Sequence, residues 1–430
     1  MLKKEINDMK DLFGEEIEIK QVKKQVIYEA NEKEYTYTNP LKLTQQFRFC
    51  GNPLSCDFYR NCSFQCNYCF AKNHVVNEEF NKKIEMADFK IVKRLFEKAF
   101  DSDEKSNNIL IELLRNKTPI HCGGMSDPFQ PVEFKKHLTY KLIEISNKYN
   151  VPVIFSTKQC YLPDEYFSIL NPKLHAFQIS LISDDAEFIK KYEPNTPTPE
   201  QRINFMKKLK SKGFWVAMRV QPLIDVNQAL NVMKKVENIV NYITVEHLKI
   251  AMNSSYQQEL FKEYMPLYTT NKYSRYFEKE TPLKEKEILF LQQNIKGCKI
   301  GVGDNDLHHL SQSRCCCGVD TIGGLFDNYL KYNITYFSTN DDKPIDDNIY
   351  IPKGDCSGCF MSQTVIKGVK SFKDYVDLYC AKNLSFLKNK ALHEKYYNFF
   401  NNSENITKFE KNIEARNQTN IFDFMADENE

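Results

Sequence analysis

Residues 62–69 of the chain read CSFQCNYC, so three cysteines follow one another at spacings of four and three. A loop with this spacing can turn three thiolates toward one point, which suits three irons of a cubane iron–sulfur cluster. The fourth iron would stay open for a small ligand. Zinc is the alternative, although structural zinc sites usually have four protein ligands. Cys50 or Cys56 could complete such a set. The stretch therefore predicts a metal centre, either a cluster or zinc.

The cysteine content of the whole chain also favours metal over disulfides. There are 14 cysteines in 430 residues, and no charged-then-apolar segment resembling a signal peptide opens the sequence. We therefore expect reduced thiols in a cytoplasmic protein. No stretch approaches the roughly 18 apolar residues of a membrane span, so no membrane association is expected. The formal net charge of +2 disfavours a large nucleic-acid footprint, because neutralising phosphates needs surplus Lys and Arg.

From about residue 41 to residue 252, short apolar runs alternate with amphipathic segments, a pattern typical of βα units. The expected strands are Pro119–Cys122, Val151–Ser156, Ala176–Leu181, Phe214–Val220 and Tyr242–Leu248. The expected helices are Met86–Phe100, Phe134–Tyr149, Pro199–Lys212 and Val226–Val240. This spacing suits parallel crossovers and predicts an α/β barrel or open sheet, with its chemistry at the carboxyl ends of the strands.

We expect three parts in the chain. Residues 1–44 are an N-terminal extension, a short helix plus an edge hairpin. Residues 45–252 are the α/β core. Beyond residue 253 the βα period is lost and Tyr, Phe, Lys and Asn dominate, which indicates a C-terminal domain over residues 253–430.

The cysteine stretch resembles the signature of the radical SAM superfamily, in which an aromatic residue, here Tyr68, precedes the last cysteine. Residues 58–72 are similar to the branch that contains spore photoproduct lyase and queuine lyases. Three further stretches are similar in the same order: GGMSDPFQPVE at 123–133, FSTK at 155–158, and YEPNTPTP at 192–199 before a helix carrying Arg202. The resemblance implies a partial (β/α)6 barrel with a Cys-bearing C-terminal domain.

The resemblance also implies cofactors and the residues that hold them. Cys62, Cys66 and Cys69 are expected to ligate a 4Fe–4S cluster whose open iron binds S-adenosyl-L-methionine. Lys158 would neutralise the methionine carboxylate. The expected cofactor-binding residues are Tyr68, Gly123, Gly124, Ser126, Asp127, Lys158 and Ser180. The plainer interpretations are a turn for the glycine pair and a solvated side chain for the lysine.

The activity implied is reductive cleavage of S-adenosylmethionine to a 5′-deoxyadenosyl radical, with an external electron donor of flavodoxin or ferredoxin type. In spore photoproduct lyases a thiol lies two residues before the Ser-Asp pair, where this chain has Gly124. We therefore expect a lyase acting on a nucleobase-like small molecule, with queuine as the specific candidate. The alternatives are a DNA photoproduct lyase or RNA-modifying enzyme, and a non-catalytic metal-binding protein.

Three residues are candidates for contact with the substrate: Cys122, Arg219 and Glu246. Cys122 is the thiol nearest to position 124. Arg219 and Glu246 lie on neighbouring expected strands and could point into the barrel, or could be partners in a structural ion pair.

A second group of cysteines lies in the C-terminal third: Cys298, Cys315, Cys316, Cys317, Cys356 and Cys359. The CxxC pair at 356–359 with one or two of the others could complete a four-ligand site. A second iron–sulfur cluster, a structural zinc, a redox dithiol, a hydrogen donor and plain buried thiols are the alternatives.

Overall fold

The computed structural model describes residues 35–43, 52, 54–74, 84–103, 106, 108–270, 276–304, 307, 310–313 and 315–327. A sheet of eight strands lies at its centre, in the order β14-β10-β9-β8-β7-β6-β3-β2. These strands are β2 (Leu41–Leu43), β3 (Leu54–Cys56), β6 (Ile120–Cys122), β7 (Val153–Thr157), β8 (His175–Ser180), β9 (Trp215–Leu223), β10 (Tyr242–His247) and β14 (Lys299–Val302). All neighbours are parallel except the β2–β3 pair.

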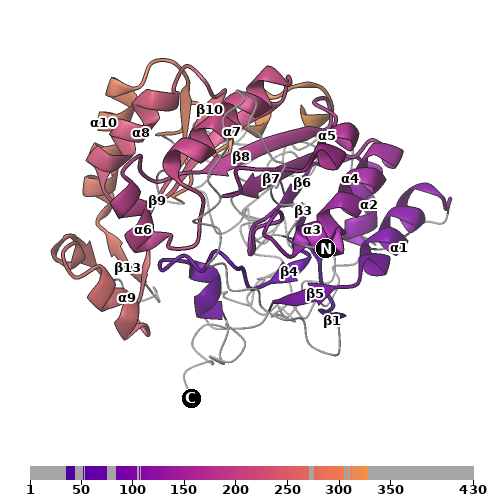
Figure 1. Ribbon diagram of the computed structural model, residues 1–430, viewed down its shortest axis with the longest axis horizontal. Helices are drawn as coiled ribbons and strands as arrows, with labels where there is room; N and C mark the ends of the chain where they lie inside the picture. Colours follow the sequence, from indigo (N-terminus) through magenta and orange to yellow (C-terminus); the bar gives the residue numbers. More distant parts are fainter. Residues whose placement is uncertain are drawn as a thin grey trace, which may run out of the picture.

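The helices follow the outer side of the curved sheet (Figure 1). They include α1 (Phe89–Phe100), α2 (Ile109–Arg115), α4 (Leu138–Tyr149), α5 (Asp164–Ile169), α6 (Ala186–Tyr192), α7 (Pro199–Ser211), α8 (Val226–Val236) and α10 (Thr281–Asn294). With helices on one side of a mostly parallel sheet, the architecture is the predicted partial barrel. The sheet is open, because β2 and β14 are its two edges.

Side-chain caps explain where the crossover helices begin. Thr198 and Gln201 form a reciprocal capping box at the start of α7, and Pro199 occupies its first turn. Asp185 caps α6 and Asp225 caps α8 by accepting hydrogen bonds from backbone N–H groups of the first turn. Asp185 and Asp225 follow the ends of β8 and β9 by five and two residues, which fixes these two strand-to-helix turns beside the carboxyl edge of the sheet.

Smaller elements surround this core. The strands β1 (Tyr35–Tyr37), β4 (Tyr59–Arg60) and β5 (Glu85–Ala87) form one small sheet. The strands β11 (Ile250–Ala251), β12 (Tyr268–Thr269) and β13 (Tyr276–Lys279) form another. Short helices complete the described chain: η3 (Phe70–His74), α3 (Glu133–Lys136), α9 (Ser255–Leu260), η5 (Met265–Leu267) and η7 (Val319–Thr321).

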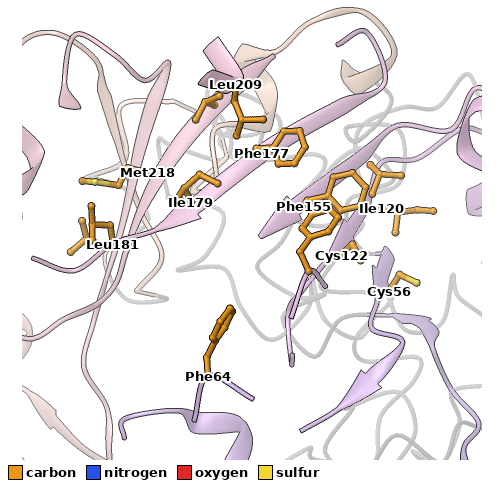
Figure 2. Close-up of a cluster of buried hydrophobic side chains, with 14 of the residues drawn as sticks. Cys56, Phe64, Ile120, Cys122, Phe155, Phe177, Ile179, Leu181, Leu209 and Met218 are labelled. Atoms are coloured by element: carbon orange, nitrogen blue, oxygen red, sulfur yellow. The ribbon is translucent and has the colours of Figure 1, made fainter. Parts of the chain in front are cut away.

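The two faces of the central sheet differ in composition. On the convex face, which the helices cover, Phe155 and Phe177 are paired in register and belong to the main apolar core (Figure 2). Because successive side chains of a strand point to opposite faces, Gln178 next to Phe177 faces the concave side. At the strand starts, the concave face carries a second, smaller apolar cluster that includes Tyr242 and Cys315.

The structure confirms the five expected strands and the four expected helical segments, with adjusted ends. The range Phe134–Tyr149 is divided between α3 and α4 at His137, whose φ of 55° interrupts the helix. Met86 lies in β5, so the helix expected from there begins at Phe89.

The expected N-terminal helix and hairpin were assigned to residues 1–44, of which the structure describes only residues 35–43, so they stay a prediction. The strand β1 pairs with β5 and β2 pairs with β3, so the two strands do not pair with each other. The strand β14 comes from the stretch assigned to the C-terminal domain, yet it extends the central sheet beside β10. Within the described ranges, no helix has both the length and the apolar character needed to span a bilayer.

Candidate functional site

The three cysteines of the CxxxCxxC stretch lie in one loop between β4 and the 3-10 helix η3. Backbone hydrogen bonds close two turns in this loop, from Gln65 N to Cys62 O at 3.3 Å and from Cys69 N to Cys66 O at 3.2 Å. Gln65 has a positive φ of 49°, which turns the chain back between the first two cysteines. Burial raises the pKa of the Cys66 thiol to about 12, and that of Cys62 is also raised by burial.

The donor set of this loop fits a cluster. Cys62 interacts electrostatically with Cys66, and Cys66 with Cys69, so the three thiols are near neighbours. In the part of the chain that the structure describes, no three Cys, His, Asp or Glu side chains surround one point as ligands of a single ion. A cubane cluster does not require such convergence, because each thiolate binds a different iron.

A buried ionic network holds the cysteine loop against the sheet. The hydroxyl of Tyr68 donates a hydrogen bond to Glu193, whose other oxygen lies 2.6 Å from the Arg202 guanidinium. The side chains of Glu193 and Arg202 are both fully buried. Lys158 Nζ lies 3.9 Å from Glu193, at the end of β7. Burial alone would raise the pKa of Glu193, but Arg202 and Lys158 outweigh it, so its pKa is lowered and the carboxylate stays charged.

Polar contacts tie the loop to segments far away in the sequence. The side-chain amide of Asn67 donates to Lys191 O at 2.7 Å, and Asn67 N donates to Tyr192 O at 2.9 Å. Ser63 N donates to the buried side chain of Gln130 at 2.9 Å. The loop is therefore positioned by the tertiary structure on both sides of its three thiols.

Lys158 brings a positive charge close to the cysteine loop. Its Nζ lies 5.7 Å from the centre of the Tyr68 ring, and it interacts electrostatically with Cys66. Burial lowers the pKa of Lys158, but the neighbouring Cys66 and Glu193 outweigh this effect and the net pKa is raised. An ammonium group therefore persists at this strand end.

The two glycines after β6 have different structural requirements. Gly123 has a φ of 100°, and a Cβ atom there would lie 2.3 Å from Ser156 O and 2.8 Å from Pro128 Cδ. Only glycine fits this position. A Cβ atom on Gly124 would lie 3.5 Å from Ser55 Oγ, which is an ordinary contact.

Ser126 and Asp127 make hydrogen bonds within the protein. Ser126 Oγ donates to Tyr59 O at 2.7 Å. Asp127 accepts from Thr157 Oγ1 at 2.7 Å and from Lys158 N at 2.6 Å. These contacts join the loop after β6 to β4 and β7, so both residues shape the strand ends. Their contact with S-adenosylmethionine stays a prediction.

A row of polar side chains crosses the concave face of the sheet, and we call it the concave polar row. Its members are His121, Ser156, Gln178, Arg219, Gln221 and Thr244. Arg219 is at its centre and donates to Ser156 Oγ at 2.6 Å and to Gln221 Oε1 at 2.9 Å. Burial and the adjacent Arg219 lower the pKa of His121 to about 4, so its imidazole is neutral at pH 7.

Arg219 and Glu246 both lie near this row, whereas Cys122 does not. Glu246 interacts electrostatically with Arg219 and forms an ion pair with Lys249 at 2.9 Å. Cys122 is paired in register with Cys56 and Phe155 and is buried in the convex-face core (Figure 2). That position faces away from Arg219 and the concave polar row.

Ser180 lies on the same strand face as Gln178, two residues further along β8. Its carbonyl accepts a hydrogen bond from Arg202 Nη1 at 2.8 Å. Ser180 therefore lies where the concave face meets the buried ionic network of the cysteine loop.

The second cysteine group is divided between two places. Cys298 packs against the convex-face core, whereas Cys315 belongs to the concave apolar cluster and Cys317 packs against it. The sulfur atoms of Cys315 and Cys317 are 3.1 Å apart. Cys356 and Cys359 lie outside the described residues.

Sequence reasoning missed most of the concave polar row and the role of Glu193. A signal for Gln178 is its position: it is a polar residue between Phe177 and Ile179 in a strand that is buried throughout. Glu193 lies in the YEPNTPTP stretch ahead of Arg202, but its partners Tyr68 and Lys158 are distant in the sequence, so its ionic role could not be inferred.

A known family model matches the part of the chain that contains the cysteine loop. Residues 57–228 match the model of the radical SAM superfamily. Residues 57–228 are therefore a radical SAM domain, and this family implies a 4Fe–4S cluster and S-adenosylmethionine as cofactors. No curated protein matches the sequence.

Several solved structures of radical SAM proteins are similar to this chain. A spore photoproduct lyase mutant with bound AdoMet and dinucleoside spore photoproduct is 14% identical, covering 57% of this chain and 75% of its own, with a TM-score of 0.41. SuiB from Streptococcus suis is 14% identical, covering 60% of this chain and 51% of its own, with a TM-score of 0.39. The methyltransferase TsrM from Kitasatospora setae is 9% identical, covering 50% of this chain and 38% of its own, with a TM-score of 0.34.

Proposed function

We propose that the protein is a radical SAM lyase that acts on a nucleobase-like small molecule, with queuine as the specific candidate. Cys62, Cys66 and Cys69 would hold the 4Fe–4S cluster. The observation that carries this proposal is the cysteine loop itself: its three thiols are near neighbours, and Glu193 and Arg202 hold the loop from within the core. When bound, the cluster and S-adenosylmethionine supply a 5′-deoxyadenosyl radical.

The residues around the loop can bind and orient the methionine part of S-adenosylmethionine. Lys158 carries a positive charge beside Cys66 and suits the methionine carboxylate. The Cβ side of Gly123 is filled by Ser156 and Pro128, so contact at this turn would use the carbonyl oxygens of Gly123 or Gly124. Ser180 would contact the same ligand from β8.

The concave polar row supports a planar, hydrogen-bonding substrate. Gln178 and Gln221 each carry an amide donor and acceptor, and Arg219 is a planar donor between them. The edge of a nucleobase presents the same kinds of groups. The net charge of +2 and the glycine at position 124 favour a small molecule over DNA. The electron would come from an external flavodoxin or ferredoxin.

The test is an anaerobic assay of the full chain. The protein is reconstituted with iron and sulfide, reduced, and given S-adenosylmethionine with a queuine-type base or, separately, with a damaged oligonucleotide. We expect 5′-deoxyadenosine and a cleaved base only in the first case, and neither from a Cys62→Ala/Cys66→Ala/Cys69→Ala variant. Product from the oligonucleotide alone would favour the DNA lyase alternative. No deoxyadenosine with any addition would favour the non-catalytic metal-binding protein.

A further inference from the structure

The segment from Cys315 to Phe326 covers part of the concave face of the sheet. Cys315, Val319 and Phe326 pack there against Ala217 and Tyr242, among the residues of the smaller apolar cluster. The segment therefore closes the concave face near the strand starts, beneath the concave polar row. Its three consecutive cysteines lie at the boundary between this apolar cluster and the row.

Close contacts fix the backbone of the cysteine run. The hydroxyl of Tyr242 donates to Cys315 O at 3.1 Å, and Gln178 Nε2 donates to Cys317 O at 3.0 Å. A Cβ atom on Gly301 would lie 2.1 Å from Cys316 O, so the missing side chain at 301 allows this close approach. The run is therefore attached to β8, β10 and β14 at once.

The thiol groups of Cys315 and Cys317, the first and last cysteines of the run, lie close together. Cys315 Sγ and Cys317 Sγ are 3.1 Å apart, while a disulfide bond is about 2.0 Å long. Cys315 is buried and Cys317 is half-buried. Arg219 interacts electrostatically with Cys317, so a cation lies near the less buried thiol. A nearby cation favours the thiolate, which is the reactive form.

We propose that Cys315 and Cys317 are a redox-active dithiol whose co-reactants are small disulfides and dithiols. The Cys317 thiolate attacks one sulfur of a small disulfide, forms a mixed disulfide and releases one thiolate. Cys315 then loses its proton and attacks Cys317 Sγ, which forms the Cys315–Cys317 bond and releases the second thiolate. The pair loses two electrons and two protons, and the small disulfide gains them as two thiols.

The oxidation state of the pair changes the chemistry of the concave face. In the reduced state the Cys317 thiol lies beneath Gln178 and Arg219, and in the oxidised state this thiol is replaced by a disulfide bond to Cys315. This inference does not depend on the cluster or on the proposed substrate. It can therefore be tested in protein that lacks the three loop cysteines, and its failure is distinct from failure of the proposed function.

The test uses the full-length chain equilibrated anaerobically in buffers of reduced and oxidised glutathione. Free thiols are alkylated, and the peptide carrying residues 315–317 is analysed by mass spectrometry. We expect reversible loss of two hydrogens from Cys315 and Cys317 as the buffer becomes more oxidising. Cys298→Ser is the matched control, because Cys298 packs against the separate convex-face core, and it should leave this transition in place.

Two variants separate the roles of the thiols, and both are made in a Cys316→Ser background because Cys316 also contacts Cys315 and Cys317. Cys315→Ser should then trap a glutathione mixed disulfide on Cys317, because no resolving thiol is left in the run. Cys317→Ser should accumulate at least several-fold less adduct on the buried Cys315. Alkylation of both thiols in every buffer would overturn the proposal. Iron or zinc that stays bound after Cys62→Ala/Cys66→Ala/Cys69→Ala and is lost with Cys315→Ser/Cys317→Ser would also overturn it.

Discussion

The convex and concave faces of the central sheet are built from the same strands but have opposite chemistry. On β8, Phe177 points into the helix-covered core, and its neighbour Gln178 binds Arg219 on the other side. On β9, Met218 likewise points into the core, and its neighbour Arg219 faces the concave side. Neighbouring positions of one strand therefore have different roles: one side chain stabilises the fold, and the next is available to bind a ligand.

The largest effect is expected from the convex face. Phe177 is fully buried, and its ring packs against Phe129, Phe155 and Phe214. Phe177→Ala should lower the free energy of unfolding by about 3–5 kcal/mol, since it removes apolar contacts and leaves a cavity. Guanidinium denaturation measures this change. A loss below about 1 kcal/mol would contradict the assignment of this face as the core.

A comparable loss of stability is expected when the buried ion pair of Glu193 and Arg202 is broken. Glu193→Gln leaves Arg202 without its carboxylate partner and should cost about 3 kcal/mol. Glu263→Gln is the matched control, because Glu263 pairs with Lys191 at the surface and should cost less than about 1 kcal/mol. Both are measured by denaturation. Equal losses in the two variants would show that the buried Glu193–Arg202 pair contributes no more to the free energy of unfolding than the surface pair does.

A smaller change in stability is expected from the concave face. Arg219→Met removes hydrogen bonds to Ser156, Gln178 and Gln221, and should cost about 1–2 kcal/mol. The same variant should lose most of its affinity for the queuine-type base, measured by calorimetric titration. If Arg219→Met destabilised the protein as much as Phe177→Ala, the concave face would have to be regarded as core.

The smallest effect is a pH dependence at the end of β10. His247 contacts Asp304 at 2.7 Å and Glu287 at 3.1 Å. Burial lowers the pKa of His247, but these two carboxylates outweigh it and the net pKa is raised above 6.5. The stabilisation is therefore complete below about pH 6.5 and is lost as pH rises through the folded pKa.

The measurement is the free energy of unfolding as a function of pH. It should fall above about pH 6.5 in the native chain and fall less steeply in His247→Gln. Identical slopes would contradict the ion pair. The pKa of Asp304 is lowered to about 2, because His247 and Lys284 outweigh burial, so its own contribution is lost only in acid, below about pH 3.8.

The strands that were predicted are segments rich in apolar residues, most of which are buried in the structure. The strands β7 to β10 are buried on both faces over much of their length, and such runs stand out in a sequence. The strand β14 was missed because Lys299–Val302 is short, and its strand character comes from pairing with β10. Pairing partners far away in the chain leave no local pattern.

The same distinction separates the parts of the site. The cysteine motif was recognised because its three thiols lie within eight residues, and its ligand role stays a prediction. The orientation of Cys122 could not be predicted, since a shift of one position moves a strand side chain to the other face. In the structure His121 faces the concave polar row and Cys122 the core. Whether a segment forms a strand depends largely on its local sequence, whereas the face of the sheet on which each of its side chains lies depends on pairing within the whole sheet.

The attachment of the cysteine loop has a consequence for how the protein is made. Tyr68 and Asn67 bind Glu193 and Lys191, which follow them by 125 and 124 residues. During synthesis the loop emerges long before these partners exist, so its contacts to Lys191 and Glu193 can form only after the strands up to β8 and the helix α6 have been added. We therefore expect an iron–sulfur cluster to be inserted late in maturation, and we expect a chain truncated before residue 193 to bind none.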